Sequence, residues 1–433
     1  AQEDEQVTTS RDDRGVWFIE GAEDASIFAM FEAMGYAVAT DRLWQAELYR
    51  RQARGRLAEL FGPDSLSTDI FMRTIGYTET ELMEGFDALS DDAEAVVSGY
   101  VAGFNRRITE IAETPTLLPF EFAAISHFPE PWTVSDILAW LALLQRNFDP
   151  EALDTGQLDN LKLLSFLQAA APDQAAGMFE DLRWTNDADA DTYFDPDRRP
   201  CRRSGNVAAA AIEPEVLAQT TSRLSAERKE MFANLEKINA RVRMGSYAWV
   251  VSGEHTRSGN PILYSGPQMG FSVPSIVAEG SLRGAGLEIS GMTVPGIPSI
   301  IIGRTPHHAW SMQVGHAHTT DYYFHTSPED MELAVRPETI LIAGADAVTL
   351  PVYRSQYGPV INPLGVVDLS AYEGSEPIIS WRYAHWGHEF KSIDGFLELA
   401  RADSMDDFGA GIEQMAVSQH FCYVDREGNI AYW

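Results

Sequence analysis

Hydrophobic residues in the first 194 positions follow the spacing of α-helices. In residues 24–62 and 133–148, apolar side chains recur at intervals of three and four, which places them along one face of a helix. Asp24 and Thr133 begin these two segments, where a side-chain oxygen can cap the first free backbone N–H groups. We therefore expect residues 1–194 to form a helix-rich region.

The regular pattern is lost between residues 195 and 245. This segment begins with prolines, paired arginines and a run of alanines, and it continues as a charged stretch, SRLSAERKEMFANLEKINARVRMG. Clusters of proline, glycine and polar residues between regular segments are typical of linkers. We expect residues 195–245 to be a spacer whose charged half is a helix with little apolar face.

After Gly245 the hydrophobic pattern changes to that of short β-strands. Runs such as SYAWVV, PILYSG and SIIIGRTPHHAWSMQVG are rich in branched and aromatic residues and are separated by glycine, proline and serine. A helix-rich first part followed by a strand-rich second part predicts an α+β architecture rather than alternating βαβ units.

Composition and charge narrow the range of partners. The chain has 433 residues and a formal net charge of −32, a field that repels nucleic acid and anionic membranes. We find no apolar run long enough to span a bilayer. The polar start AQEDEQVTTSRDD is typical of a mature N-terminus after signal-peptide removal, so we expect a periplasmic or secreted protein. The two cysteines, Cys201 and Cys422, form no CxxC pattern and imply neither zinc nor a disulfide framework.

Ser246 stands where the spacer meets the first strand. A serine hydroxyl needs a base to become a nucleophile, and the chain has no G-x-S-x-G elbow. If the Gly245–Ser246 bond is cut, the new α-amino group of Ser246 titrates near pH 7.7–8.0 and can take the hydroxyl proton. Gly245 suits such a cut because it permits a strained backbone. A serine that simply opens a strand after a turn glycine is the alternative.

The sequence around Ser246 resembles the start of the catalytic chain in the penicillin acylase family of N-terminal nucleophile hydrolases. GSYAWVV is followed by NPILYSGPQMGFSVPS, with Trp249 three residues and Gln268 twenty-two residues after the serine. The resemblance continues through GSLRGAGLEISGMTVPGIPSIIIGRTPHHAWS and YVDREGNIAYW. Upstream, GYAVATDRLWQAELYRRQARGRLAELFG is similar to the family's α-chain signature.

The resemblance implies an αββα sandwich made from a precursor by excision of a spacer. It divides the chain into an α-chain-like helical region (1–194), a spacer (195–245) and the N-terminal part of a β-chain (246–433). The spacer would be removed by autocatalytic cleavage, which leaves Ser246 as a new N-terminus.

By the same resemblance, Ser246 attacks an amide carbonyl and forms an acyl-enzyme that water hydrolyses. Gln268 orients the amide, and the backbone N–H of Val314 is one oxyanion donor. The second donor in the family is an asparagine beyond the end of this sequence, so we expect the remaining β-chain polypeptide as a partner. The implied substrate is a small N-acyl amide of the penicillin type.

The family's acyl pocket maps onto side chains from the last predicted α-chain helix and from the segments after the nucleophile. These are Leu144, Asn147, Phe148, Met269 and Ile302. Such a lining favours an apolar acyl group, aryl or alkyl, over a dicarboxylic one such as glutaryl. A one-residue shift of the alignment would place Arg146 in the pocket, although helix geometry turns Arg146 about 100° from Asn147.

Catalysis by an N-terminal serine requires no cofactor, but members of the penicillin G type bind a structural calcium ion. Asp321 and the carbonyl of Thr320 match two of its ligand positions. Gln157 and His318 replace two carboxylate ligands. Because calcium prefers several hard oxygen ligands, this departure makes the calcium site doubtful.

Three other functions stay open at this point. An acyl-homoserine-lactone-type acylase is one, and a truncated, non-catalytic family member is another. A metallohydrolase is the third, because five of the ten histidines lie between residues 307 and 325, although no H-E-x-x-H motif is present. These five are His307, His308, His316, His318 and His325.

Overall fold

The computed structural model describes residues 7–153, 156–183, 212–243, 245–315, 317–329, 331–365 and 368–433. Its helices before the expected spacer are α1 (Ile27–Arg54), α2 (Ala58–Phe61), α3 (Leu66–Ile75), α4 (Glu79–Asp87), α5 (Asp91–Glu113), α6 (Phe120–Ala124), α7 (Val134–Asn147), α8 (Pro150–Leu153), α9 (Gly156–Ala170) and α10 (Ala175–Arg183). They are followed by α11 (Pro214–Lys237), α12 (Ser392–Arg401) and α13 (Met405–Glu413).

The strands form three sheets. An eight-stranded sheet has the order β1 (Val7–Arg11), β2 (Trp17–Gly21), β5 (Ala278–Gly284), β6 (Leu287–Thr293), β7 (Ile302–Arg304), β8 (His308–Val314), β14 (Gln419–Asp425) and β15 (Ile430–Tyr432). A five-stranded sheet has the order β10 (Ala334–Ile340), β11 (Val348–Ser355), β12 (Gly358–Asn362), β13 (Ile378–Tyr383) and β9 (Thr320–His325). The third sheet is the hairpin of β3 (Ser246–Val251) and β4 (Ile262–Pro267).

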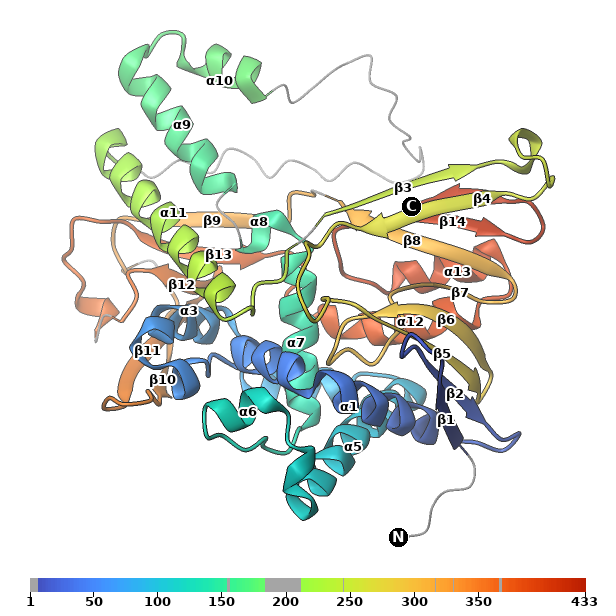
Figure 1. Cartoon of the computed structure of the whole chain (residues 1–433). Coiled ribbons are helices and arrows are strands. Elements are labelled where there is room, and N and C mark those ends of the chain that lie inside the picture. The colour runs from blue at the N-terminus through green and yellow to red at the C-terminus, as the bar shows by residue number, and fades with distance from the viewer. Residues whose placement is uncertain are drawn as a thin grey trace.

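Strand β8 shows how the layers are stacked. The Ser311 hydroxyl bonds to that of Ser265 on β4, whereas its neighbour Trp310 packs on Phe408 of α13 at a ring distance of 5.9 Å. Successive strand residues point to opposite faces, so the hairpin and α13 cover opposite faces of this part of the large sheet (Figure 1). The expected mixture of helix and sheet is confirmed.

The full αββα sandwich stays a prediction. The described residues supply the hairpin, the large sheet and a helical layer beneath it, but among them no second helical layer shields the outer face of the hairpin. Trp249, Ile262 and Tyr264 on that hairpin are each about half exposed, at 54%, 51% and 52%.

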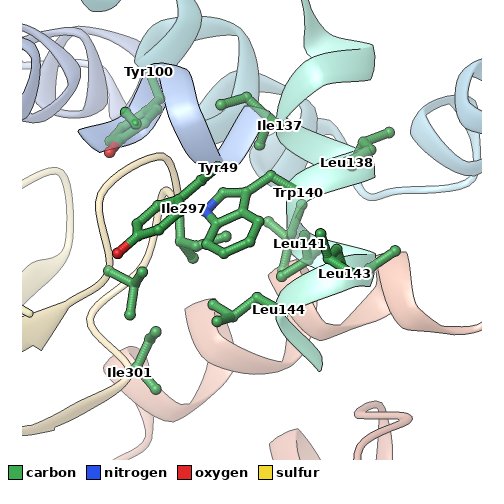
Figure 2. Close-up of a cluster of buried hydrophobic side chains, with 14 of the residues drawn as sticks. Tyr49, Tyr100, Ile137, Leu138, Trp140, Leu141, Leu143, Leu144, Ile297 and Ile301 are labelled. Carbon is green, nitrogen blue, oxygen red and sulfur yellow. The ribbon is translucent and has the colours of Figure 1, made fainter. Parts of the chain in front are cut away.

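Helix α7 anchors the helical region to the strand-rich region. Its N-cap is Thr133 as expected, and Asp136 completes a capping box. Trp140 stacks on Tyr49 of α1 at 4.5 Å and donates a hydrogen bond to the carbonyl of Pro295, 3.0 Å away. Figure 2 shows this buried cluster, in which Trp140 lies between Tyr49 and the following side chains of α7. The middle of α7 is thereby fixed between α1 and the segment that connects β6 to β7.

Helix α1 differs from its predicted bounds at both ends. The N-cap is Ser26, which accepts a hydrogen bond from the N–H of Ala29, so the prediction of Asp24 was wrong by two residues. The helix ends at Gly55, whose φ of 59° is a left-handed conformation that glycine adopts at little cost. Residues 24–62 are therefore not one continuous helix.

The α-chain-like signature on α1 is explained by a buried ion-pair cluster. Glu47 is fully buried and bonds to both Arg50 and Arg51, with 2.6 Å between Oε1 and Nε of Arg51. Arg51 also bonds to Glu59 at 2.7 Å and to Glu130 at 3.1 Å. Buried charges persist only when paired, which accounts for the alternation of glutamate and arginine in this segment.

The described part of the expected spacer is more ordered than its composition predicts. Helix α11 packs against α9, and its Leu224, Met231 and Leu235 are buried. Their spacing of seven and four residues forms one apolar stripe, so the prediction of little apolar face was wrong. Residues 184–211, which include Cys201, lie outside the described residues, and the boundaries at 194 and 245 stay predictions. Of the helices in the described part of the chain, none has the length and hydrophobicity to cross a membrane.

Candidate active site

Ser246 is the first residue of β3 and lies at the end of the hairpin nearest α7 and α8 (Figure 1). It pairs with Pro267 of β4 in an antiparallel register. Tyr247, Trp249 and Tyr264 stack along the hairpin with ring distances of 4.9–5.6 Å. These aromatic cross-strand contacts stabilise a two-stranded sheet, which holds Ser246 at a defined position over β8.

Gly245 is held close to the neighbouring chain segment. Its carbonyl oxygen accepts a hydrogen bond from the backbone N–H of Gln268 at 2.5 Å. A Cβ atom at residue 245 would stand 3.0 Å from the carbonyl oxygen of Gln268, a tighter contact than side chains normally make. Glycine is therefore the residue type that this close approach favours immediately before Ser246.

A narrow apolar cavity of about 40 Å³ adjoins Ser246. Of the site residues expected from the sequence, Phe148, Met269, Ile302 and Val314 line it together with Gly245 and Ser246. Residues that the sequence did not indicate complete the wall: Pro267, Val277, Met292, Thr293, Val294, Ile301, Met312 and Gln419. The alternation in β8 was a usable signal, since Met312 and Val314 share one face of that strand.

Three other expected site residues do not line this cavity. Leu144 is buried within the cluster of Figure 2, close to Ile301. The amide group of Asn147 donates to the carbonyl of Leu143 at 3.0 Å, so this side chain bonds back onto its own helix. Gln268 contacts the site through its backbone bond to Gly245, and its side chain is not part of the cavity wall.

Arg146 points away from the cavity, as its place on the helix predicted. Its guanidinium is buried and bonds to Glu389 at 2.8 and 3.2 Å. It also lies 5.0 Å from the ring centres of both Tyr77 and Trp386. No positive charge from α7 therefore reaches the Ser246 cavity.

Beside Ser246, residues of β8 and β14 contact the backbone at the end of α7. Val314 pairs with Gln419 across the two strands, and the side chain of Gln419 donates to the carbonyl of Phe148 at 3.5 Å. The three residues thus form one continuous wall of the cavity. This wall brings the backbone of Val314 into the same site as the serine.

The cavity has no side chain that could serve as a base. Among the described residues that line it there is no histidine, aspartate, glutamate or lysine. A hydroxyl in such surroundings stays protonated and unreactive unless a base is supplied from another source. The α-amino group that cleavage would create at Ser246 is a base at the required position.

The calcium site expected from the resemblance stays a prediction. The ring Nε2 of His318 lies 3.0 Å from the carbonyl oxygen of Thr320 and 3.4 Å from the carboxylate of Asp321, so these three expected ligand positions lie close together. Gln157 adds an amide and no charge. Calcium prefers several carboxylate and carbonyl oxygens, and this set offers one carboxylate.

The histidines after residue 306 do not gather around a metal position. His308 is buried between the Thr305 hydroxyl and the carbonyl of Leu399, and burial lowers its pKa to about 4. His307 lies 3.3 Å from Asp403 instead, while His316 lies outside the described residues. Within the described ranges no group of three or more His, Cys, Asp or Glu side chains could hold a metal ion.

Comparison with known proteins gives a family match over nearly the whole chain. The family model described as penicillin amidase matches residues 6–433. Penicillin G acylase of Escherichia coli is 25% identical over 443 residues, which cover 93% of this chain and 50% of that protein. Penicillin acylase 2 proenzyme of Pseudomonas sp. (strain SE83) is 28% identical over 82% of this chain and 43% of its own length.

An acylase of another named type and a solved structure also match this chain. An acyl-homoserine lactone acylase of Pseudomonas syringae pv. syringae is 22% identical over 97% of this chain and 48% of that protein. A solved chain of the thermostable penicillin G acylase from Alcaligenes faecalis is 28% identical, with a TM-score of 0.39 over 45% of this chain and 98% of that chain. The chain thus spans about half the length of the curated relatives it matches.

Proposed function

The chain belongs to the penicillin amidase family, and from this premise we propose that its complete polypeptide hydrolyses N-acyl amides through an acyl-enzyme on Ser246. The observation that carries the proposal is the cavity wall, which presents one serine and no basic or acidic side chain. Cleavage of the Gly245–Ser246 bond supplies the missing base as the α-amino group of the serine itself. One relative is named as a proenzyme, which supports a processed chain.

Each step of the proposed reaction assigns a proton to a named group. The α-amino group takes the proton of the Ser246 hydroxyl while the oxygen attacks the amide carbonyl. The same group then delivers this proton to the leaving amine, and the acyl ester forms. In the next step the α-amino group takes a proton from water, which attacks the ester, and returns it to the Ser246 oxygen as the carboxylic acid is released.

Stabilisation of the tetrahedral intermediate requires two hydrogen-bond donors near Ser246. The backbone N–H of Val314 is the donor that this chain contributes, because Val314 lines the same cavity. Loss of one such donor typically costs about 10²–10³ in rate. The second donor, an asparagine side chain, belongs to the polypeptide that completes the family's length.

The cavity favours an apolar acyl group. Its wall is built mainly from methionine, valine and isoleucine side chains together with Phe148, and none of the described residues that line it carries a charge. Apolar surface gains roughly 25 cal/mol for each Å² that it buries, whereas a carboxylate without a partner loses several kcal/mol. We expect phenylacetyl and alkyl amides to be better substrates than glutaryl amides.

An acylase acting on acyl-homoserine lactones is the second candidate function. The predominantly aliphatic wall suits a linear alkyl chain, and a relative with that activity in its name matches 97% of this chain. Both candidates share the nucleophile and the cavity and differ in the amine that is released. Side-by-side hydrolysis of penicillin G and of an alkanoyl-homoserine lactone distinguishes them.

Further β-chain polypeptide is the partner that the exposed surface of the hairpin suits. The outer face of the hairpin exposes Trp249, Ile262 and Tyr264, and the following loop exposes Phe271 and Val273 almost completely. An exposed apolar patch of this kind marks an interface. We propose that further β-chain polypeptide covers this patch. We also propose that the protein works in the periplasm or outside the cell. Its substrates there are small molecules rather than nucleic acid or membranes.

The test compares Ser246→Ala with Ser258→Ala, an exposed hairpin serine, in the complete polypeptide. We expect hydrolysis of phenylacetyl and octanoyl amides of one chromogenic amine to vanish in the first variant and to persist in the second. Undiminished turnover by Ser246→Ala refutes the proposed nucleophile. A chelator that abolishes activity while a hydroxyl-directed inhibitor has no effect favours the metallohydrolase instead.

A further inference from the structure

A second cavity, separate from the Ser246 site, lies in the helix-rich region. It has a volume of about 210 Å³ and opens between the end of α1, the turn from α3 to α4, the middle of α7, and β10. No residue lines both cavities. A ligand in this second cavity would therefore leave the acyl site free.

The charge of its wall is opposite to that of the chain as a whole. Five arginines and two glutamates line it, in a protein with a formal net charge of −32. Arg56 and Arg146 have carboxylate partners behind the wall, Glu59 and Glu389. Arg54 likewise pairs with Glu79 of the wall at 2.8 Å, so the local excess of positive charge is found on Arg73 and Arg336.

Arg73 and Arg336 share a single carboxylate. Glu338 lies 2.7 Å from Nη1 of Arg73 and 2.8 Å from Nε of Arg336. The three side chains are only 19–23% exposed, so their charges are screened less than those of surface pairs. The carboxylate of Glu338 balances only one of the two guanidinium charges. The remaining positive charge attracts an anion to this site.

Backbone contacts hold the two guanidinium groups in fixed orientations. Nε of Arg73 donates to the carbonyl of Gly55 at 3.0 Å, and Nη2 of Arg336 donates to the carbonyl of Arg73 at 2.6 Å. Each guanidinium has five N–H donors, so both keep donors beyond these bonds. Pre-oriented guanidinium donors match the two oxygens of a carboxylate.

The opposite side of the cavity is apolar. Ala139, Ala142 and Leu143 of α7 line it, together with Met72 and Ile75 of α3. An inorganic anion would leave this surface without a partner, whereas an alkyl chain would bury it and gain from the hydrophobic effect. The cavity therefore combines a cationic end with a hydrophobic wall.

We propose that this cavity binds a short-chain aliphatic carboxylate, with the carboxylate group at Arg73 and Arg336 and the alkyl chain along α7. The proposal is independent of the reaction at Ser246. A carboxylate is recognised here by charge and an alkyl chain by the apolar wall, so both parts of the ligand are required for tight binding.

Isothermal titration calorimetry of the complete polypeptide with hexanoate, 1-hexanol and inorganic phosphate tests the proposal. We expect saturable binding of hexanoate, with 1-hexanol and phosphate each weaker by about tenfold or more. At the Ser246 cavity, which has no charged lining, 1-hexanol would bind at least as well as hexanoate. Absence of saturable hexanoate binding, or equal affinity for 1-hexanol or phosphate, overturns the proposal.

Two variants with opposite expected effects locate the site. Arg336→Gln should weaken hexanoate binding roughly tenfold or more, since one charged hydrogen-bond partner is lost. The control is Arg257→Gln, at an exposed arginine on the hairpin turn, which should leave hexanoate binding unchanged. Glu338→Gln removes the shared carboxylate and should tighten binding. Unchanged affinity in Arg336→Gln, or weaker binding in a folded Glu338→Gln protein, refutes the site.

Discussion

Introducing a positive charge at Met269 should change the acyl preference in a predictable direction. Met269 lines the Ser246 cavity and is partly exposed, so a longer polar side chain can enter there without disrupting the core. Pentanoyl and glutaryl amides of the same amine have acyl chains of equal length and differ by one terminal carboxylate. Their ratio of kcat/KM therefore isolates the cost of placing that charge in the cavity.

The magnitude follows from the composition of the wall. Because no charged side chain lines the cavity, burying the glutaryl carboxylate costs several kcal/mol. A cost of about 3 kcal/mol corresponds to roughly a 100-fold preference for pentanoyl. In Met269→Arg, a charged hydrogen bond of about 1.5–3 kcal/mol should shift the ratio toward glutaryl by roughly 10- to 100-fold.

The assay measures kcat/KM for both amides with the complete polypeptide, with Met269→Gln as a control of similar length and no charge. Met269→Gln should leave the preference for pentanoyl largely in place. A glutaryl amide that is the better substrate of the unaltered protein refutes the apolar cavity. An equal change of the ratio in the arginine and glutamine variants shows that shape rather than charge governs it.

Three further predictions concern stability and processing. Glu47→Ala removes the buried carboxylate that bonds to both Arg50 and Arg51, so urea denaturation should show a loss of about 3–5 kcal/mol, whereas the exposed Glu113→Ala should lose little; equal losses would contradict the role of the cluster. Burial lowers the pKa of His308 to about 4, below the value near 6.5 of an unfolded chain, so the unfolded state gains the proton first. The contribution of His308 to the free energy of unfolding should then fall by about 1.4 kcal/mol per pH unit as pH drops from about 6.5 toward 4. A His308→Gln protein whose free energy of unfolding has the same dependence on pH would disprove this contribution. Mass spectrometry of the mature complete protein should find residues 195–245 missing, and recovery of α11 from fully active enzyme would argue against excision.

Local signals in the sequence predicted the type of most elements but not every boundary. The capping box at Thr133 is visible as a local pattern, and the structure has it. Residues 24–62 keep helical spacing past Gly55, where the backbone turns left-handed, because apolar spacing does not record φ. The stripe on α11 is masked in the sequence because charged residues surround its buried positions, Leu224, Met231 and Leu235.

The site was predictable only in part, for a different reason. The position of Ser246 follows from its neighbours in the sequence, and the alternation in β8 places Val314 on the same face as Met312. Val277 and Ile301 come from separate elements and reach the cavity through packing of the hairpin, the large sheet and α7. Such convergence depends on long-range contacts, which a local pattern does not contain.

The most direct test of the account is the identity of the N-terminus in the active protein. N-terminal sequencing of the complete, active polypeptide should yield a chain that begins Ser246-Tyr247-Ala248, and Ser246→Ala should remain uncleaved and inactive. A Gly245–Ser246 bond that stays intact in a fully active enzyme contradicts the central claim, because the serine would then have no adjacent base.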